Sequence, residues 1–140
     1  MSKVELLTVL LSWATTLSGY SVAELPEVQF KPHSFFVENA CLIKPYYHAW
    51  GWQELRPIKQ KNCKVEGWYN DKYIIYIDKK YSDLEGFGSS LVVHEMVHYL
   101  QHLDGMTDSC LREREAYQTQ NDYIREVLAT VYYIPRRGCL

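Results

Sequence analysis

The chain is organised around the stretch Leu91-Val92-Val93-His94-Glu95-Met96-Val97-His98-Tyr99-Leu100. Apart from His94, Glu95 and His98, its side chains carry no charge, so a helix over these residues would have almost no polar face. A helix of that kind is buried, and buried ionisable groups are normally paired or bound to a metal. The stretch therefore predicts a buried helix that carries a metal site, and it argues against an ordinary surface helix.

The spacing of the three ionisable residues indicates their roles. Two histidines four residues apart on a helix project from the same face, so His94 and His98 can bind one metal ion. Glu95 is rotated from His94 by about 100° around the helix axis, which places it beside the metal and not on it. A carboxylate in that place can take a proton from a metal-activated water. We therefore expect His94 and His98 as metal ligands and Glu95 as the catalytic general base.

A catalytic zinc site also needs a third protein ligand and an open fourth position. The candidates lie in a second helix that the sequence predicts over residues 109–132, limited by Pro135. Its apolar residues share one arc and are Ala116, Tyr117, Tyr123, Ile124, Val127 and Val131. Glu113 projects onto the centre of this arc, whereas Glu115 projects to the opposite side and is expected to be solvated. We favour Glu113 as the ligand and keep Glu115 as the alternative, because a displaced helix start would shift the phase.

The HExxH motif at 94–98, followed by a helix with the sequence EREA at 113–116, resembles the gluzincin branch of zinc metallopeptidases. That branch includes thermolysin and the membrane CaaX-processing peptidases, whose Glu-x-x-Ala-Asp pattern supplies a zinc-binding glutamate and selects Glu113 here. Tyr117 stands where that pattern has aspartate, and its hydroxyl could replace the carboxylate that contacts a ligand histidine. The chain length also resembles that of minigluzincins and small bacterial zincin-like domains. The resemblance implies a zinc-dependent peptidase.

Length and composition bound the architecture. A chain of 140 residues suffices for one domain and is too short for the two-lobed proteases. The net charge of −2 and the lack of a basic stripe argue against nucleic acid as the main partner. We expect a single α+β, zincin-like domain over residues 1–140, with an N-terminal helix, a small mixed sheet of three or four strands, the metal helix and the ligand helix. In this plan the sheet covers one side of the two helices and the cleft opens on the other.

Residues 3–18 allow two interpretations. The basic start, the apolar run and the small residues at 21–23 fit a signal peptide with its cleavage site. However, Glu5 interrupts the run and the polar residues fall on one helical arc, which favours a packing helix that ends at Gly19. In either case the run is too short to span a membrane. Both an exported and a cytoplasmic location stay open.

The middle of the chain predicts strands. Residues 28–30 and 34–38 are expected to form two strands, followed by an irregular segment to Pro57. A hairpin follows, with arms at 65–69 and 73–77.

The hairpin turn is expected at Asn70-Asp71. The zincin resemblance makes 73–77 the strand at the upper rim of the cleft, where an extended substrate peptide would pair. The metal helix should begin near Gly88.

Several further residues have more than one possible role. His33 and His48 are expected to be surface histidines, and Gln101 and Gln120 solvated helix residues, with contact to the metal ligands as the alternative. Residues 48–52 could line a cleft, although packing of their aromatic rings is favoured. A group that stabilises the oxyanion is needed, and the candidates are Tyr46, Tyr47, His102, Tyr117 and Tyr123.

The four cysteines at 41, 63, 110 and 139 have no C-x-x-C spacing, which argues against a separate zinc ribbon. Three pairings are possible and the sequence does not choose between them. Cys41 with Cys63 would close a loop beside the hairpin, and Cys110 with Cys139 would tie the ends of the last helix region. The even count favours disulfides and an oxidising compartment, with buried thiols as the alternative.

The function that the sequence predicts is hydrolysis of peptide bonds in a peptide or protein substrate by a monomeric zinc enzyme. The metal would be held by His94, His98 and Glu113, with Glu95 as the base. The alternative is a non-catalytic binding domain that keeps zinc as a structural staple. Such a site has no need for Glu95, which favours the enzyme.

Overall fold

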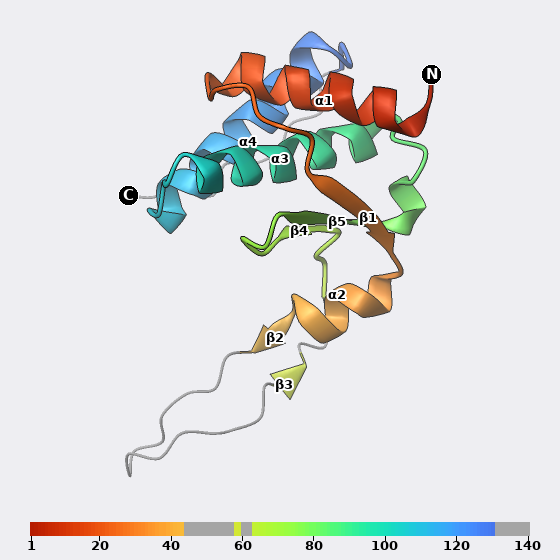
Figure 1. The fold of residues 1–140 in the computed structure, drawn as a ribbon. Coiled ribbons are helices and arrows are strands. Elements are labelled where there is room, and N and C mark those ends of the chain that lie inside the picture. The colour runs from red at the N-terminus through yellow and green to blue at the C-terminus, as the bar shows by residue number, and fades with distance from the viewer. Residues whose placement is uncertain (44–57, 60–62, 131–140) are drawn as a thin grey trace.

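The computed structural model describes residues 1–43, 58–59 and 63–130 of the chain (Figure 1). Its elements follow in the order α1 (Lys3–Ser18), β1 (Glu27–Lys31), α2 (His33–Asn39), β2 (Leu42–Ile43), β3 (Ile58–Lys59), β4 (Gly67–Tyr69), β5 (Ile74–Asp78), the 3₁₀ turn η1 (Lys79–Tyr81), α3 (Gly86–Leu103) and α4 (Ser109–Glu126). The described part thus has four α-helices, a three-stranded mixed sheet and a two-stranded ladder of β2 with β3. This confirms the predicted α+β class.

Helix α1 has a clear signal at each end. Ser2 and Glu5 form a capping box, in which the Glu5 main-chain N–H donates to Ser2 Oγ at 3.1 Å and the Ser2 N–H donates to Glu5 Oε1 at 3.3 Å. Gly19 ends the helix in the left-handed conformation, with φ at 82°. The prediction of a packing helix ended by Gly19 is confirmed, and Glu5, which interrupts the apolar run, caps the helix. None of the described helices is long and apolar enough to cross a bilayer.

The main sheet has the strand order β1-β5-β4. Strand β1 runs parallel to β5, with Val28 opposite Ile75, and β4 runs antiparallel to β5, with Trp68 opposite Tyr76. The predicted strand at 28–30 and the predicted hairpin are confirmed.

The position expected for the rim strand is wrong. Most of residues 73–77 belong to the central strand β5, which is paired on both edges, so among the described residues the free edge near α3 belongs to β4. The hairpin arms are rich in β-branched and aromatic residues, but no local pattern shows that β1, from far earlier in the chain, takes the other edge of β5.

The strand predicted at 34–38 is also wrong, because these residues belong to helix α2. Pro32 caps the helix in an extended conformation, which its fixed φ permits. A short apolar run does not distinguish a strand from one buried helical turn. Here Phe36 is fully buried, and the Phe35 ring lies 4.7 Å from the Tyr76 ring on the face of the sheet away from α3. Figure 1 shows α2 beneath the sheet in this arrangement.

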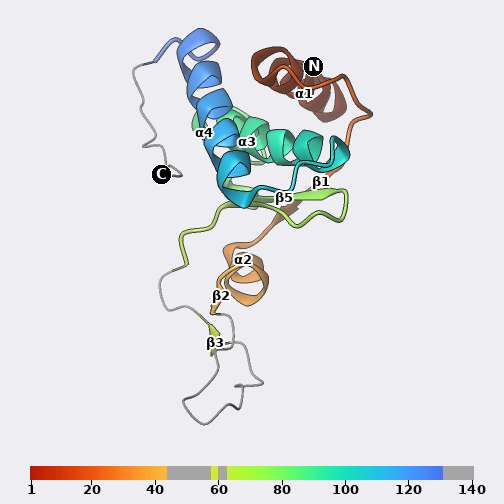
Figure 2. The ribbon, with the colours of Figure 1, turned by 90° about the vertical axis from the view of Figure 1, so that its left-hand side faces the viewer.

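Helix α3 lies at the centre of the fold, between α1 on one side and the sheet on the other (Figure 1). Thirteen of its 18 residues are buried, which confirms the expected buried helix. Helix α4 packs alongside α3 and also contacts α1 (Figure 2). Helix α3 begins at Gly86, two residues before Gly88, near which its start was predicted. A Cβ at Gly88 would lie 2.7 Å from Tyr81 Cβ, so glycine here permits η1 to pack closely on the helix.

Helix α4 is shorter than predicted and ends at Glu126 instead of 132. Its start agrees with the prediction, since Asp108 Oδ1 accepts hydrogen bonds from the main-chain N–H groups of the first turn at 3.1 and 3.0 Å. At the other end the N–H groups of Val127 and Leu128 both bond to the Tyr123 carbonyl, which closes a final turn. Ala129 then takes a positive φ of 49° that leaves the helix.

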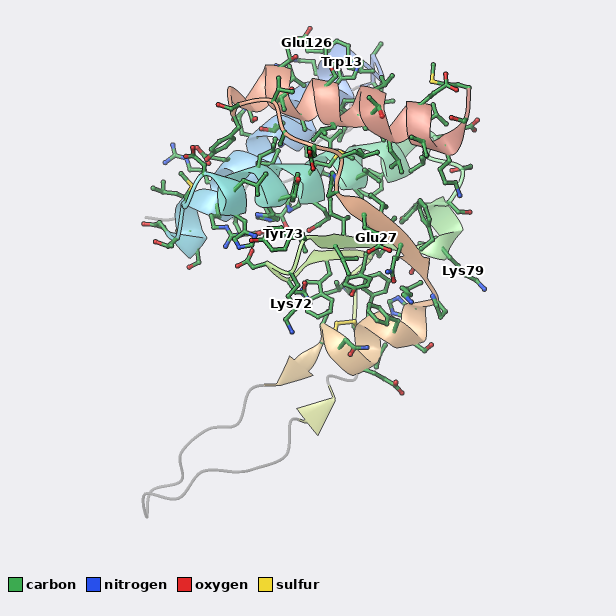
Figure 3. All side chains as sticks on the ribbon, in the orientation of Figure 1. Trp13, Glu27, Lys72, Tyr73, Lys79 and Glu126 are labelled. Carbon is green, nitrogen blue, oxygen red and sulfur yellow. A yellow bond between two sulfur atoms is a disulfide. The ribbon has the colours of Figure 1, made fainter. Side chains whose placement is uncertain are left out.

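One of the possible disulfides joins Cys41 to Cys63, with Cα atoms 5.6 Å apart (Figure 3). Cys110 is also disulfide-bonded. Its considered partner Cys139 lies outside the described residues. So do His48, the aromatic segment 48–52, and most of the segment expected to be irregular.

Candidate metal centre

Three side chains from α3 and α4 converge. His98 Nε2 lies 2.6 Å from Glu113 Oε1, and His94 Nε2 lies 4.0 Å from Glu113 Oε2. One ligand atom from each of the three residues lies within 4.8 Å of the others, so the group could hold a metal ion. In a tetrahedral zinc site with ligand bonds of about 2.1 Å, neighbouring ligand atoms are roughly 3.4 Å apart. The observed separations bracket that value.

The two candidate glutamates have separate partners. Glu113 faces the histidines, whereas Glu115 Oε1 accepts hydrogen bonds from Tyr20 Oη at 2.5 Å and from Gln101 Nε2 at 2.9 Å. The preference for Glu113 agrees with this geometry. The expectation that Glu115 is solvated is wrong, because Tyr20, just after α1, reaches across to it. Helical phase within one helix does not show such a contact.

Each histidine has a buried amide partner. His94 Nδ1 lies 2.9 Å from Gln120 Oε1, and His98 Nδ1 lies 2.9 Å from Gln101 Oε1. Gln101 and Gln120 are 0% and 1% exposed, so the expectation of solvated glutamines is wrong and the alternative is correct. Their spacing carried the signal, because Gln101 follows His98 by one helical turn and Gln120 follows Glu113 by two. Metal-binding histidines almost always donate their second N–H to such a partner.

Tyr117 takes a different place from the one suggested by the family pattern. Its ring meets the His94 ring edge to face, with centroids 4.6 Å apart. The Nδ1 atom of His94 is bonded by Gln120, not by the Tyr117 hydroxyl that could have contacted a ligand histidine. Tyr117 therefore limits the motion of the His94 ring by packing.

Glu95 lies between α3 and the edge strand β4 and is 6% exposed. The main-chain N–H of Tyr69 donates to its carboxylate, and a Cβ built at Gly67 would lie 3.1 Å from Glu95 Oε2. Burial raises the pKa of Glu95 to about 7, against the opposing field of His98. A carboxyl with this pKa can both accept and donate a proton near neutral pH.

The pKa directions of His94 and Glu113 favour metal binding, whereas that of His98 opposes it, because a bound metal must displace the His98 proton. Burial and the nearby His98 lower the pKa of His94 to about 4, so its imidazole is neutral. Burial also lowers the pKa of His98, but the hydrogen bond to Glu113 and the neighbouring carboxylates outweigh it, and the net direction is upward. Burial raises the pKa of Glu113, yet its hydrogen bond to His98 outweighs this and keeps it ionised.

The converging side chains line a cavity of about 850 Å³. One wall is the segment 64–71, which contains β4, and the other is formed by α3 and α4. The cleft therefore opens along the free edge of the sheet. The expectation that it opens on the helix side away from the sheet is wrong, because α1 covers that side (Figure 2). Phe87, Leu91 and Tyr117 give the cavity an apolar part next to His94.

Sequence reasoning missed Arg112, which lies on the cavity wall beside Glu113. Its guanidinium makes two hydrogen bonds to Asp71, at 2.7 and 3.2 Å, and so joins the hairpin turn to α4. Its Nη2 and Nε also lie 3.4 Å from the His98 carbonyl and from Gln101 Oε1. No local pattern in the sequence relates Arg112 to a turn 41 residues earlier.

The other candidates are placed as follows. Tyr123 is buried and donates to Ser89 Oγ, and His102 bonds to the Tyr69 hydroxyl at 2.7 Å, outside the cavity lining. The ring of the hairpin residue Tyr73 lies 5.0 Å from the His102 ring at the end of α3, tilted by 32° (Figure 3). His33 bonds to Asp78 and to the Cys63 carbonyl, at a distance from the metal centre, in agreement with its expected surface role. Tyr46 and Tyr47 lie outside the described residues. Tyr117 is the oxyanion candidate that lines the cavity.

No family model, curated protein or solved structure matches this chain. The functional argument therefore rests on the chemistry and geometry of the site.

Proposed function

We propose that this chain is a zinc-dependent metallopeptidase in which His94, His98 and Glu113 hold the metal and Glu95 is the general base. The observation that carries the proposal is the convergence of the two motif histidines with Glu113 in a cavity that also contains a buried glutamate. The resemblance of the motif and of the downstream glutamate to gluzincins supports the same conclusion.

The donor set fits zinc. Two imidazole nitrogens and one carboxylate oxygen are the ligands of thermolysin-type catalytic sites. Within the described part of the chain, three residues form the cluster, so a zinc ion held there could take water or substrate as its fourth ligand. Cobalt or manganese could bind the same donors, so the identity of the metal belongs to the proposal.

The mechanism assigns separate tasks to the surrounding residues. A bound zinc ion would polarise the scissile carbonyl and lower the pKa of a water molecule. Glu95, buried beside the two histidines, would take the proton of that water and pass it to the leaving amine. Gln101 and Gln120 hold the two imidazole rings in orientation through their Nδ1 atoms. Tyr117, on the cavity wall, is our candidate for donating to the oxyanion.

The free edge of β4 supplies a surface for an extended peptide. The Asp78 N–H donates to the Glu66 carbonyl, so the main-chain groups of Glu66 point toward β5. Every second residue of a strand points the same way, so those of Trp68 also point toward β5. The main-chain groups of Gly67 and the Tyr69 carbonyl then lie on the free edge beside the cavity, while the Tyr69 N–H donates to Glu95. A peptide can add there as a further strand, with little demand on its sequence. We therefore propose that substrate pairs with β4 and not with residues 73–77.

The test is hydrolysis of a mixed peptide library by the zinc-loaded protein, with Glu95→Gln beside it. Glu126→Gln, which changes an exposed glutamate of α4, is the control. We expect cleavage by the wild type and by the control, and none by Glu95→Gln at unchanged zinc content. A wild type that binds zinc but cleaves no peptide would favour the non-catalytic binding domain. Loss of zinc in Glu95→Gln would make Glu95 a ligand.

A further inference from the structure

A continuous row of buried hydrogen bonds leads away from His94. The His94 Nδ1 atom lies 2.9 Å from Gln120 Oε1, Gln120 Nε2 donates to Ser90 Oγ at 3.1 Å, and Ser90 Oγ donates to the Phe87 carbonyl at 2.6 Å. His94, Gln120 and Ser90 are 6%, 1% and 0% exposed. Protein groups therefore determine how each of these side chains is oriented.

The end of the row fixes the direction of every bond in it. A serine hydroxyl has one proton, and Ser90 gives it to a carbonyl that can only accept. Toward Gln120, Ser90 is therefore an acceptor, so the amide NH₂ faces Ser90 and the amide oxygen faces His94. His94 must then carry its proton on Nδ1, which leaves the lone pair of Nε2 on the side of Glu113.

We propose that Ser90 is a positioning residue for the metal centre, which acts through Gln120 to place the proton of His94 on Nδ1 and leave Nε2 free for the metal. The effect on metal binding rests on the proposed function. The position of the proton does not.

The second histidine shows why Ser90 is the decisive group. Gln101 Nε2 donates to the Glu115 carboxylate and to the Arg112 carbonyl, both at 2.9 Å, and neither group can donate in return. The orientation of Gln101 is thus fixed without a hydroxyl. On the His94 side the orientation of Gln120 depends on the Ser90 hydroxyl, and without it a reversed Gln120 would turn its NH₂ toward His94 and favour the proton on Nε2.

Ser89 offers a matched control for Ser90. It is 2% exposed, it donates to the Gly86 carbonyl at 2.6 Å, and it accepts from Tyr123 Oη at 2.9 Å. Both serines therefore have one main-chain acceptor and one side-chain donor, but only Ser90 connects to a metal ligand. A purely structural role predicts similar effects of Ser89→Ala and Ser90→Ala.

The experiment locates the imidazole proton of His94 in the metal-free full chain, by long-range proton–nitrogen correlation spectra at neutral pH. A His94→Asn variant assigns the signals. Zinc affinity is then measured by competition with a chelator. In Ser90→Ala we expect the His94 proton to move in part to Nε2, and zinc affinity to fall about tenfold. Ser89→Ala should keep wild-type values for both.

A rescue variant separates orientation from packing. In Ser90→Ala combined with Gln120→Glu, the carboxylate can only accept, so the His94 proton should return to Nδ1 and zinc affinity should rise again. If Ser90→Ala does not fold, Ser90→Cys keeps the approximate volume, weakens the acceptor, and should show the same two changes in smaller size.

Two results would overturn the inference. One is a wild type whose His94 proton is on Nε2, and the other is a Ser90→Ala variant that equals Ser89→Ala in proton position and zinc affinity. A wild type that binds no zinc but has the proton on Nδ1, displaced in Ser90→Ala, would refute the proposed function and support the role of Ser90. If the wild type cleaves peptide but Ser90→Ala changes neither the position of the His94 proton nor zinc affinity, only the inference about Ser90 is refuted.

Discussion

Substitution of Gly67 by alanine tests whether β4 positions the general base. The new Cβ would lie 3.1 Å from Glu95 Oε2, 3.3 Å from Glu95 Cγ and 3.4 Å from Ile77 Cδ1. Ordinary contacts of this kind begin near 3.4 Å, so the Glu95 side chain must move by about 0.3 Å or more. Since a displacement of about 1 Å at a catalytic group can cost roughly 100-fold in rate, we expect kcat/KM for peptide hydrolysis to fall several-fold to about tenfold.

The same substitution should change stability little. Mild overpacking costs about 1 kcal/mol, and the loss of glycine freedom in the unfolded chain offsets about 0.4–1 kcal/mol of it. Gly88→Ala is the contrasting variant, because its Cβ would lie 2.7 Å from Tyr81 Cβ, which cannot swing away. We expect Gly88→Ala to lower the free energy of unfolding by about 3 kcal/mol while the folded fraction keeps its activity.

Urea unfolding and peptide hydrolysis at saturating zinc measure the two effects separately. The reasoning would be refuted if Gly67→Ala kept full activity. It would also be refuted if Gly88→Ala lost activity per folded molecule as strongly as Gly67→Ala does.

Three further changes have expected outcomes. Arg112→Ala should lower the free energy of unfolding by about 1–2 kcal/mol in urea titrations, because it removes a paired guanidinium whose partner Asp71 is 44% exposed. Arg112→Lys should not restore the lost stability. Zinc affinity should fall as the pH decreases, because the pKa of His98 is raised and the metal must displace its proton. Calorimetry in buffers of different ionisation enthalpy would detect the released proton. A zinc affinity that does not change with pH between 6 and 8 would contradict this prediction. Replacing Cys41 and Cys63 together by serine should lower the free energy of unfolding by about 3 kcal/mol, because the disulfide closes a separation of 22 residues. An unchanged urea midpoint would contradict this prediction.

The parts of the site that follow from local periodicity could be predicted from the sequence. His94 and His98 share a helix face by their spacing, and the apolar arc of the next helix selected Glu113. The N-terminal helix could be predicted in the same way, from its leucines and from Gly19. In each case the decisive interaction lies within about two helical turns.

The parts that depend on contacts between distant segments were missed. Strand β1 pairs with β5 across more than forty residues, which moves the free edge of the sheet to β4. Tyr20 reaches Glu115, and Arg112 reaches Asp71, through packing that no single helix or strand displays. Gln101 and Gln120 are polar residues on helices, and their burial is indicated by their spacing from the ligands together with the requirement that each ligand histidine has a partner.

The most direct test of the account is the metal content of the purified protein by elemental mass spectrometry, for wild type, Glu113→Ala and Glu115→Ala. Glu115 is the matched control, because it lies on the same helix and contacts Gln101 without facing the two histidines. We predict about one zinc per chain in the wild type and in Glu115→Ala, and none in Glu113→Ala. A wild type that contains no zinc and takes up none when zinc is supplied would contradict the account, and equal zinc content in all three proteins would exclude Glu113 as a ligand.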